Sequence, residues 1–300
     1  MVEKAILGID LGGTKIMSGL ISARGELLGT PITVPTGGQD PAEVIINRIF
    51  NIIERTLGDA QLKISNISGI GIGSTGPLDM KEGLVLECPF LPTLNNFPLR
   101  KTIYDKYHIP VLLDNDANCF ALGECFFGAG RGHDVVLGYT LGTGIGCAVV
   151  IKNKIYAGAT QHAGEIWTSP FKDKTIEDFV SGRGISQMYR TISGEVKSAL
   201  EIAELAYGGD TFAKQTWDQF GEHLAYALSW GINTLDPDVV ILGGSISNAM
   251  ELFQPAMEGF LRRHLCPLPA KKTKVIKARL GDHAGLIGSA CLVFEAKTNK

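Results

Sequence analysis

The sequence predicts an α/β fold with one sheet in each of two domains. Apolar strand patterns alternate with amphipathic helix patterns along the chain, which is the arrangement of α/β proteins. A strand–glycine turn–strand segment, AILGIDLGGTKIMSGLI at 5–21, returns at 135–151 as VVLGYTLGTGIGCAVVI, which indicates two halves built on one plan. The length of 300 residues is sufficient for two domains that each bury a core.

The first half of the chain begins with a hairpin pattern. Residues 5–9 form an apolar run, residues 10–15 a polar glycine turn, and residues 16–21 a second apolar run. A helix is expected from Asp40, which can cap it, with Pro41 in its first position. One face of this helix gathers apolar side chains, namely Val44, Ile45, Ile49, Ile52 and Ile53.

The next elements place small and polar residues at the ends of strands. Residues 67–72 predict a buried strand that runs into Gly-Ser-Thr-Gly-Pro at 73–77. Residues 111–113 predict a short strand that runs into Asp-Asn-Asp at 114–116, and residues 117–127 predict a helix. Ligands of open α/β sheets bind at such strand ends, so these residues are candidates for a site.

The second half predicts a long helix, a buried strand and an edge strand. An amphipathic pattern at 211–235 stops before Pro237, because proline does not continue a helix. Residues 239–242 form an apolar strand pattern followed by a glycine turn at 243–244. The basic run at 271–277 contains two apolar residues, which favours a solvated strand edge over a nucleic-acid patch.

Composition excludes several classes of function. With 28 Lys and Arg against 31 Asp and Glu, the formal net charge is −3, which gives no electrostatic footprint for nucleic acid or for an anionic membrane. No apolar run reaches the roughly 18 residues of a membrane span. The start of the chain lacks the pattern of a signal peptide. We therefore expect a cytoplasmic protein with small-molecule ligands.

The six cysteines are scattered and form no CxxC pair. A disulfide framework is unusual for this length and spacing, and small hydrophobic side chains in a reducing compartment are the expected role. The sequence therefore predicts neither disulfides nor a metal site made of cysteines.

Three glycine-rich turns, each after a predicted strand, indicate a phosphate clamp. They lie at 12–14, 142–144 and 243–244. Glycine lets backbone N–H groups approach phosphate oxygens, and threonine adds a hydroxyl donor. One such turn is usually only a turn, whereas three in one chain favour a nucleotide. The sequence contains neither GxxxxGK[ST] nor a GxGxxG that opens a helix after the first strand.

Asp116 is the candidate general base. Phosphoryl transfer to a hydroxyl requires one carboxylate that accepts the proton and a Mg²⁺ ion that neutralises the phosphates. The position of Asp116 after a strand fits this role, and it fits equally a cap for the helix that follows.

The motifs together resemble the ROK family of sugar kinases and repressors, in the actin-like ATPase superfamily. The resemblance covers residues 5–290, in the order DLGGTK, STGP, LDNDANC, LGTGIG, AGE, SGRG, LDPDVVILGG and AGLIGSA. It implies two actin-like (ribonuclease H-like) domains with an active-site cleft between them. The smaller domain would be residues 1–115 and the larger 116–300, with the last helix returning to the first domain. The resemblance also implies a homodimer.

The resemblance implies ATP and Mg²⁺ as cofactors and assigns the site residues. Asp116 would be the catalytic base, and Asp10 would reach Mg²⁺ through water. The nucleotide would be held by Asp10, Gly12, Gly13, Thr14, Lys15, Thr143, Gly144, Gly243 and Gly244. The sugar hydroxyls would be held by Gly76, Asn115, Glu165 and Glu177.

The sequence departs from the family pattern in the sugar site. Thr168 stands where the family carries a histidine that contacts both sugar and zinc, and the CxCGxxGC zinc run is missing. His162 is the only histidine nearby, and we expect it to be structural or exposed. Phe90 replaces an asparagine of many sugar-specific members. We therefore expect no structural zinc, as in a zinc-free branch of the family.

These observations predict an ATP-dependent hexose kinase that phosphorylates a primary hydroxyl, with glucose as substrate. N-acetylmannosamine or fructose is the alternative substrate. The repressors need a DNA-binding helix-turn-helix ahead of the core, and nine residues precede Asp10, so we expect no nucleic-acid partner. A catalytically inactive sugar-binding regulator is the alternative of a different class.

Overall fold

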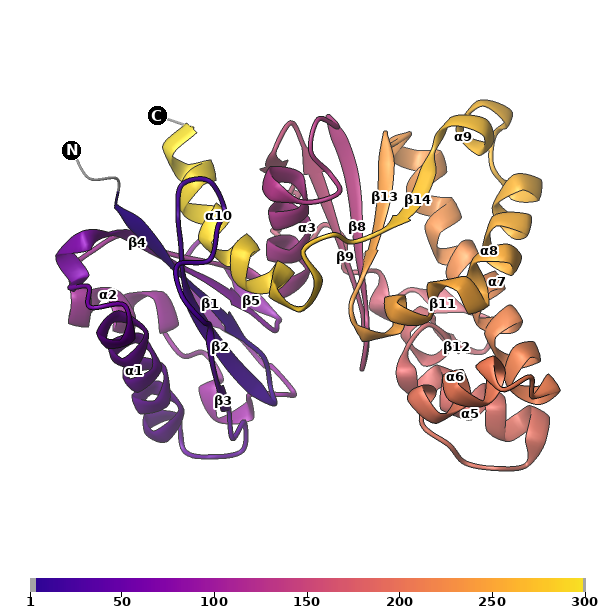
Figure 1. Cartoon of the computed structure of the whole chain (residues 1–300), viewed down its shortest axis with the longest axis horizontal. Coiled ribbons are helices and arrows are strands. Elements are labelled where there is room, and N and C mark those ends of the chain that lie inside the picture. The colour runs from indigo at the N-terminus through magenta and orange to yellow at the C-terminus, as the bar shows by residue number, and fades with distance from the viewer. Residues whose placement is uncertain (1–3, 299–300) are drawn as a thin grey trace.

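The computed structural model describes residues 4–298 and contains two five-stranded sheets (Figure 1). In the first sheet the strand order is β3-β2-β1-β4-β7, and its strands are β1 (Ala5–Leu11), β2 (Lys15–Ile21), β3 (Ile32–Pro35), β4 (Ile67–Ser74) and β7 (Val111–Asn115). The first three strands pair antiparallel, while β1, β4 and β7 are parallel. The parallel strands therefore end at one edge of this sheet.

The second sheet repeats this plan. Its strand order is β10-β9-β8-β13-β14, and its strands are β8 (Val135–Leu141), β9 (Ile145–Ile151), β10 (Lys154–Ile155), β13 (Val239–Gly243) and β14 (Lys274–Lys277). The hairpin β8–β9 begins and ends 130 positions after the hairpin β1–β2, and β13 and β14 run parallel to β8. The predicted repeat and the α/β class are confirmed.

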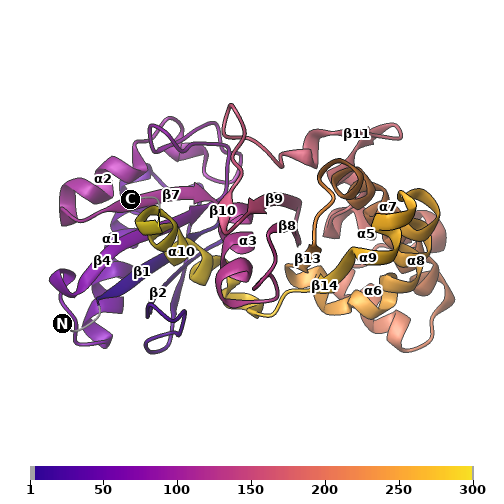
Figure 2. The same cartoon turned by 90° about the horizontal axis from the view of Figure 1, so that it is seen from above.

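Helices cover both faces of both sheets. The helices are α1 (Ala42–Asp59), α2 (Leu99–Tyr107), α3 (Asp116–Phe127), α4 (Ile176–Phe179), α5 (Gly182–Ser193), α6 (Ala199–Tyr207), α7 (Thr211–Leu235), α8 (Met250–His264), α9 (Pro267–Lys272) and α10 (Ala284–Thr298). Two small hairpins, β5 (Leu78–Asp79) with β6 (Leu84–Val85) and β11 (Pro170–Phe171) with β12 (Lys174–Thr175), complete the fold. Both views place α3 and α10 between the two sheets (Figure 2).

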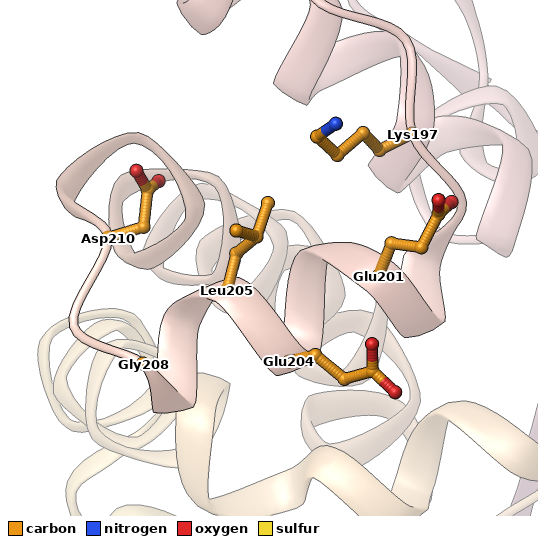
Figure 3. A pocket seen from close by; sticks show the side chains of 6 residues that line it. All are labelled: Lys197, Glu201, Glu204, Leu205, Gly208 and Asp210. Atoms are coloured by element: carbon orange, nitrogen blue, oxygen red, sulfur yellow. The ribbon is translucent and has the colours of Figure 1, made fainter.

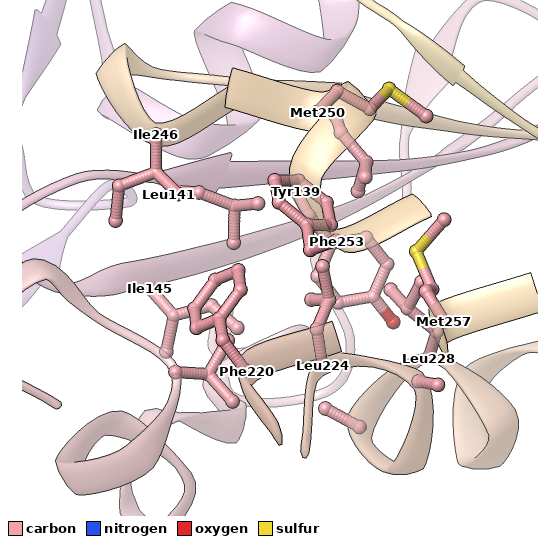
Figure 4. Close-up of a cluster of buried hydrophobic side chains, with 14 of the residues drawn as sticks. Tyr139, Leu141, Ile145, Phe220, Leu224, Leu228, Ile246, Met250, Phe253 and Met257 are labelled. Atoms are coloured by element: carbon pink, nitrogen blue, oxygen red, sulfur yellow. The ribbon is translucent and has the colours of Figure 1, made fainter. Parts of the chain in front are cut away.

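Three apolar cores hold these layers together. One joins α1 and α2 to the first sheet. A second joins α7 and α8 to the second sheet, where Tyr139 and Leu141 meet Phe220 and Phe253 (Figure 4). The third contains α3 and α10 with side chains from both sheets, such as Ile6 and Val136. The site therefore lies on two sheets that share one central core.

The predicted helix at Asp40 differs in its first turn. Pro41 is the N-cap and makes no side-chain capping bond, while Asp40 pairs with Arg48 at 2.5 Å, so the predicted Asp40 cap is wrong. Four of the five apolar side chains are buried, whereas Val44 is 39% exposed, because the buried stripe runs through its neighbour Ile45. In the basic run, 274–277 forms the edge strand β14, and the two lysines before it end α9.

Candidate active site

The parallel strands of the first sheet bring the predicted polar residues to one edge. Leu11 lies opposite Ser74, and Ser74 lies opposite Asn115, so the strands β1, β4 and β7 end level with one another. Asp10, Gly76 and Asp116 lie in or just after these three strand ends. Residues more than 100 positions apart in the sequence thus meet at the carboxyl edge of one sheet.

The second sheet presents its two glycine turns in the same way. Thr140 of β8 lies opposite Gly243 of β13, so the turn at 142–144 and Gly244 follow at one edge. Gly244 has φ +79°, and a Cβ there would lie 2.3 Å from the carbonyl oxygen of Leu141. Only glycine fits this position, because the backbone of β8 passes too close for a side chain.

The first glycine turn is fixed by its own backbone and by a buried threonine. Gly12 N–H donates to the carbonyl of Lys15 at 3.0 Å, and the Thr36 hydroxyl donates to the carbonyl of Gly12 at 2.6 Å. Thr36 is fully buried, and its own N–H donates to the carbonyl of Thr14. The turn is therefore rigid before any ligand binds, and Thr36 is a supporting residue that the sequence motifs do not reveal.

Phe90 lies on this first turn. A Cβ at Gly13 would lie 2.6 Å from the Cβ of Phe90, and a Cβ at Gly38 would lie 2.3 Å from the carbonyl oxygen of Phe90. The Phe90 side chain is still 54% exposed. The sequence predicts Phe90 in the sugar site, and the structure shows that its backbone and Cβ also pack against the predicted phosphate turn.

Asp116 is the first residue of α3, and Asn115 is the N-cap. The amide oxygen of Asn115 accepts the Ala117 N–H at 2.9 Å, and the Asp116 carboxylate accepts the same N–H at 2.8 Å. Asn115 is thus the cap residue, and the Asp116 carboxylate bonds to the same N–H. One carboxylate oxygen of Asp116 stays outside this bond.

The pKa values of two buried carboxylates in this site are raised. Burial raises the pKa of Asp116 to about 7, with a further contribution from the charge of Asp10 and a smaller one from Glu165. Burial also raises the pKa of Asp10, and the nearby charge of Lys15 opposes this shift. A carboxylate with a pKa close to neutral is suited to exchange protons at physiological pH.

A glycine of the last helix makes room for Asp10. A Cβ at Gly285, near the start of α10, would lie 3.0 Å from Oδ2 of Asp10. The sequence motif AGLIGSA contains this glycine, but the motif alone gives it no role. The structure shows that α10 reaches the carboxyl edge of the first sheet, where its backbone abuts the Asp10 carboxylate.

The predicted sugar residues Gly76 and Asn115 are neighbours. The Asn115 side-chain nitrogen lies 3.3 Å from the position of a Cβ at Gly76, and the peptide bond from Gly76 to Pro77 is cis. Any side chain at Gly76 would press on Asn115. The structure thus brings these two residues together beside Asp116.

Glu165 is held by a tryptophan. The indole Nε1–H of Trp167 donates to Oε2 of Glu165 at 2.5 Å. The preceding Gly164 has φ +94°, and a Cβ there would lie 2.2 Å from the carbonyl oxygen of Cys147. His162 of the same loop is exposed, and its Nδ1 lies 2.6 Å from the carbonyl oxygen of Thr160. The loop is therefore packed on β9 and presents Glu165 at its end.

Glu177 contacts the second glycine turn. Its Oε2 accepts the Ile145 N–H at 3.3 Å and lies 2.3 Å from the position of a Cβ at Gly144. Arg183 lies 3.6 Å from its other oxygen. The sequence assigns Glu177 to the sugar, and the structure places its carboxylate against this turn and near Arg183.

A pocket on the surface lies away from these residues. It has a volume of about 420 Å³ and lies along α6, between Lys197 and Asp210 (Figure 3). Two of its acidic side chains serve helix ends: Glu201 accepts from Ser198, and Asp210 caps α7 through the Ala213 N–H. Two of the three acidic residues in the lining, Glu201 and Asp210, therefore have a structural role.

The chain belongs to the ROK family. The model of that family matches residues 6–296. The chain is 33% identical over 306 residues to an N-acetyl-D-glucosamine kinase from Photobacterium profundum, covering 95% of this chain and 98% of the relative. It is 32% identical over 321 residues to a glucokinase from Thermotoga maritima, covering 98% of this chain and 99% of the relative.

A solved structure supports the same assignment. The ROK family glucokinase from Streptomyces griseus, in complex with glucose and AMPPNP, superposes with a TM-score of 0.82 at 28% identity. The match covers 96% of this chain and 98% of that chain. The fold is therefore the actin-like ATPase fold of ROK sugar kinases.

Proposed function

We propose that this chain is an ATP-dependent hexose kinase that phosphorylates a primary hydroxyl, with glucose as its substrate. The observation that carries the proposal is the position and pKa of Asp116. This carboxyl lies at the carboxyl edge of the first sheet with a pKa of about 7. Named sugar kinases among the relatives support the reaction class.

Asp116 acts as the general base. Its free carboxylate oxygen accepts the proton of the sugar hydroxyl as that oxygen attacks the γ-phosphate of ATP. The N–H of Ala117 fixes the other oxygen at 2.8 Å, which sets the direction of the free one. Asn115 and Gly76, which lie against each other beside this base, would orient the sugar hydroxyls.

The glycine turns hold the nucleotide. The rigid turn of Gly12 and Gly13, with Thr14 and Lys15 exposed at its tip, offers backbone N–H groups and a positive charge to the phosphates. The turn with Thr143 and Gly144 faces them from the second sheet, and Gly243 and Gly244 flank the adenosine. Glu165 and Glu177 remain predicted sugar ligands.

Asp10 fits a magnesium role. It is a buried carboxylate whose raised pKa shows that its charge lacks sufficient stabilisation from the protein. Carboxylate oxygens are preferred Mg²⁺ ligands, and Asp10 would hold the ion through water beside the first turn. When bound, Mg²⁺ neutralises the charge that develops on the transferring phosphoryl group.

We expect this chain to discriminate among related sugars less strongly than family members that carry a histidine at the position of Thr168. A site with fewer hydrogen-bonding side chains rejects related sugars less strongly, because fewer buried polar groups are left unpaired. The bulk of Phe90 favours the plain hexose over a sugar with an N-acetyl group. N-acetylmannosamine and fructose are the alternatives. The homodimer, the cytoplasmic location and the boundary near residue 116 stay predictions.

A coupled kinase assay on a panel of sugars tests the proposal. Initial rates are measured side by side for glucose, mannose, fructose, N-acetylglucosamine and N-acetylmannosamine, with ATP and Mg²⁺. We expect the highest kcat/KM for glucose. A preference above tenfold for an N-acetyl sugar would overturn the substrate, and the absence of turnover with every sugar would overturn the kinase and favour the inactive regulator.

A further inference from the structure

Glu124 is a fully buried carboxylate in α3 that lies outside the site already described. Its exposed fraction is 0%. Its Oε1 accepts the N–H of Leu280 at 2.8 Å, both oxygens accept the N–H of Arg279 at 3.0 and 3.1 Å, and its Oε2 accepts the N–H of Ala129 at 2.7 Å. The carboxylate is therefore solvated by three backbone N–H groups.

These bonds join two segments that are far apart in the sequence. Ala129 follows the end of α3, whereas Arg279 and Leu280 lie in the connection from β14 to α10. A Cβ at Gly128 would lie 2.0 Å from Oε2 of Glu124, so glycine at this position makes room for the carboxylate. The local backbone is thus shaped around Glu124.

The two joined helices meet the two carboxylates at the edge of the first sheet, since α3 carries Asp116 and α10 packs against Asp10 of β1. Asp116 is the first residue of α3, two turns before Glu124. The connection that Glu124 holds leads into α10, whose Gly285 abuts Asp10. The helices also cross in close contact, since a Cβ at Gly288 would lie 1.7 Å from the carbonyl oxygen of Cys119. The crossing fixes how close the helices lie, and Glu124 fixes the start of α10 relative to α3.

We propose that Glu124 is a positioning residue for phosphoryl transfer, which holds α10 against Asp10 and thereby sets the placement of Asp10 relative to Asp116. Asp10 and Asp116 are like charges in a buried site and repel each other. Glu124 holds the start of α10, and with it the contact of Gly285 with Asp10, from the far side of the α3–α10 crossing.

The Glu124→Gln variant tests the proposal. An amide keeps the size of the side chain but turns a donor toward backbone N–H groups, which leaves at least one of them without an acceptor. We expect kcat to fall about tenfold while the KM values for ATP and sugar change less than about threefold. A residue that supports only the fold would lower the amount of folded enzyme without changing the chemistry of the site.

The pH profile of kcat/KM distinguishes positioning from folding. Asp116 is faced by Asp10 from β1, by Glu165 from the segment between β10 and β11, and by the thiols of Cys88 and Cys119. If Glu124→Gln lets Asp10 move away, its charge raises the pKa of Asp116 less, so that pKa falls. The acid limb of the pH profile of kcat/KM then moves to lower pH. We expect a shift of about half a pH unit or more.

Two further variants complete the experiment. The Gly128→Ala variant retains the Glu124 side chain, but the added Cβ would displace its carboxylate. We expect the same shift in the acid limb of the pH profile of kcat/KM. Asp238→Asn is the control, because Asp238, an exposed residue, also accepts two backbone N–H groups, of Asp134 and Val135, but at the opposite end of the strands of the second sheet. We expect this control to change the melting temperature and to leave the acid limb in place.

The positioning role of Glu124 rests on the proposed function, in which Asp116 is the base. The outcomes below separate a failure of the positioning role from a failure of the proposed function. If Asp116→Asn retains wild-type turnover, the proposed function fails. If Asp116→Asn is inactive while Glu124→Gln and Gly128→Ala keep both the wild-type kcat and the wild-type acid limb, the positioning role alone is overturned. An equal shift of the limb in Asp238→Asn would also overturn it.

Discussion

Asp10 and Asp116 lie close enough that the charge of Asp10 raises the pKa of Asp116, second only to burial as a cause. The pairing of β1, β4 and β7 produces this relationship, because it brings the ends of the three strands level at one edge. In the proposed site these two carboxylates have different roles. We propose that Asp116 accepts a proton near neutral pH, and Asp10 would face the metal and the phosphates.

Asp116→Asn is expected to lower kcat by about 10²–10⁴-fold, the usual size of a general-base effect. The amide has the same shape and keeps an oxygen for the Ala117 N–H, so the start of α3 should survive. Binding of ATP and sugar, measured by calorimetry, should change little. Turnover at the wild-type rate would show that Asp116 only supports the helix.

The same variant should be more stable than the wild type at high pH. Folding raises the pKa of Asp116 from its ordinary 3.8 to about 7, so the native state binds this proton more tightly than the unfolded state. The ionised carboxylate therefore destabilises the native state increasingly between pH 4 and pH 7. Urea unfolding should show a stabilising effect of Asp116→Asn at pH 8 that shrinks toward pH 4. A difference independent of pH would contradict the pKa of Asp116.

Gly285→Ala is expected to separate activity from stability. Alanine is favoured over glycine inside helices by up to about 1 kcal/mol, so α10 itself should not be weakened. Its Cβ would lie 3.0 Å from Oδ2 of Asp10 and would push that carboxylate away. We expect kcat to fall about tenfold with an unchanged or higher melting temperature. Gly259→Ala in α8 is the control, because the nearest atom to its Cβ, a side-chain nitrogen of Arg263, is 3.6 Å away.

Stability should fall in mild acid because of His223. Burial and the charge of Lys172 lower the pKa of His223 from its ordinary 6.5 to about 4. Lys172 Nζ lies 2.6 Å from Nε2, so the neutral ring accepts this bond and carries its proton on Nδ1, which has no partner among the described residues. The unfolded chain therefore binds a proton first as the pH falls below 6.5, and stability is lost between about pH 6.5 and pH 4.

The size of this effect is up to about 3 kcal/mol, at 1.36 kcal/mol for each unit of pKa. Urea unfolding at pH 7 and pH 5 would measure it. His223→Phe fits the aromatic contacts with Phe171 and Phe179 and removes the titrating group. We expect this variant to lose less stability than the wild type between the two pH values, whereas an equal loss would assign the pH dependence to other groups.

The sequence predicts the hairpins and strand ends of this fold because they depend on local pattern. The apolar runs and glycine turns of 5–21 and 135–151 form hairpins whose strands have corresponding bounds, since alternation of apolar strands and glycine turns suffices to define them, although the two pairings differ by one residue in register. The convergence of Asp10 and Asp116 also follows from the sequence once the sheet is parallel. The cap at Asp40 was wrong because its carboxylate pairs with Arg48 instead.

Contacts between distant segments could not be predicted in this way. Gly285 and Glu124 act on residues more than 150 positions away, and no periodicity or motif spacing shows which side chain meets which backbone. The same holds for Glu177, which the motif assigns to the sugar and the structure places against Gly144. Such contacts arise from the crossing of helices and loops, which only the assembled structure shows.

Trp167→Phe is expected to weaken sugar binding without affecting the chemistry. The Trp167 indole N–H donates to Glu165 at 2.5 Å, and Glu165 is a predicted ligand of the sugar hydroxyls. Phenylalanine keeps an aromatic surface for the sugar but releases the Glu165 carboxylate, which must then lose conformational freedom when the sugar binds. We expect the KM for glucose to rise about three- to tenfold, with kcat and the KM for ATP within about twofold of the wild type.

Tyr104→Phe serves as the control, because Tyr104 is an exposed aromatic residue of α2, outside the predicted site. If the KM for glucose stays at the wild-type value in Trp167→Phe while Glu165→Gln raises it, then the carboxylate binds sugar without help from the indole, and the loop backbone at Gly164 alone positions it.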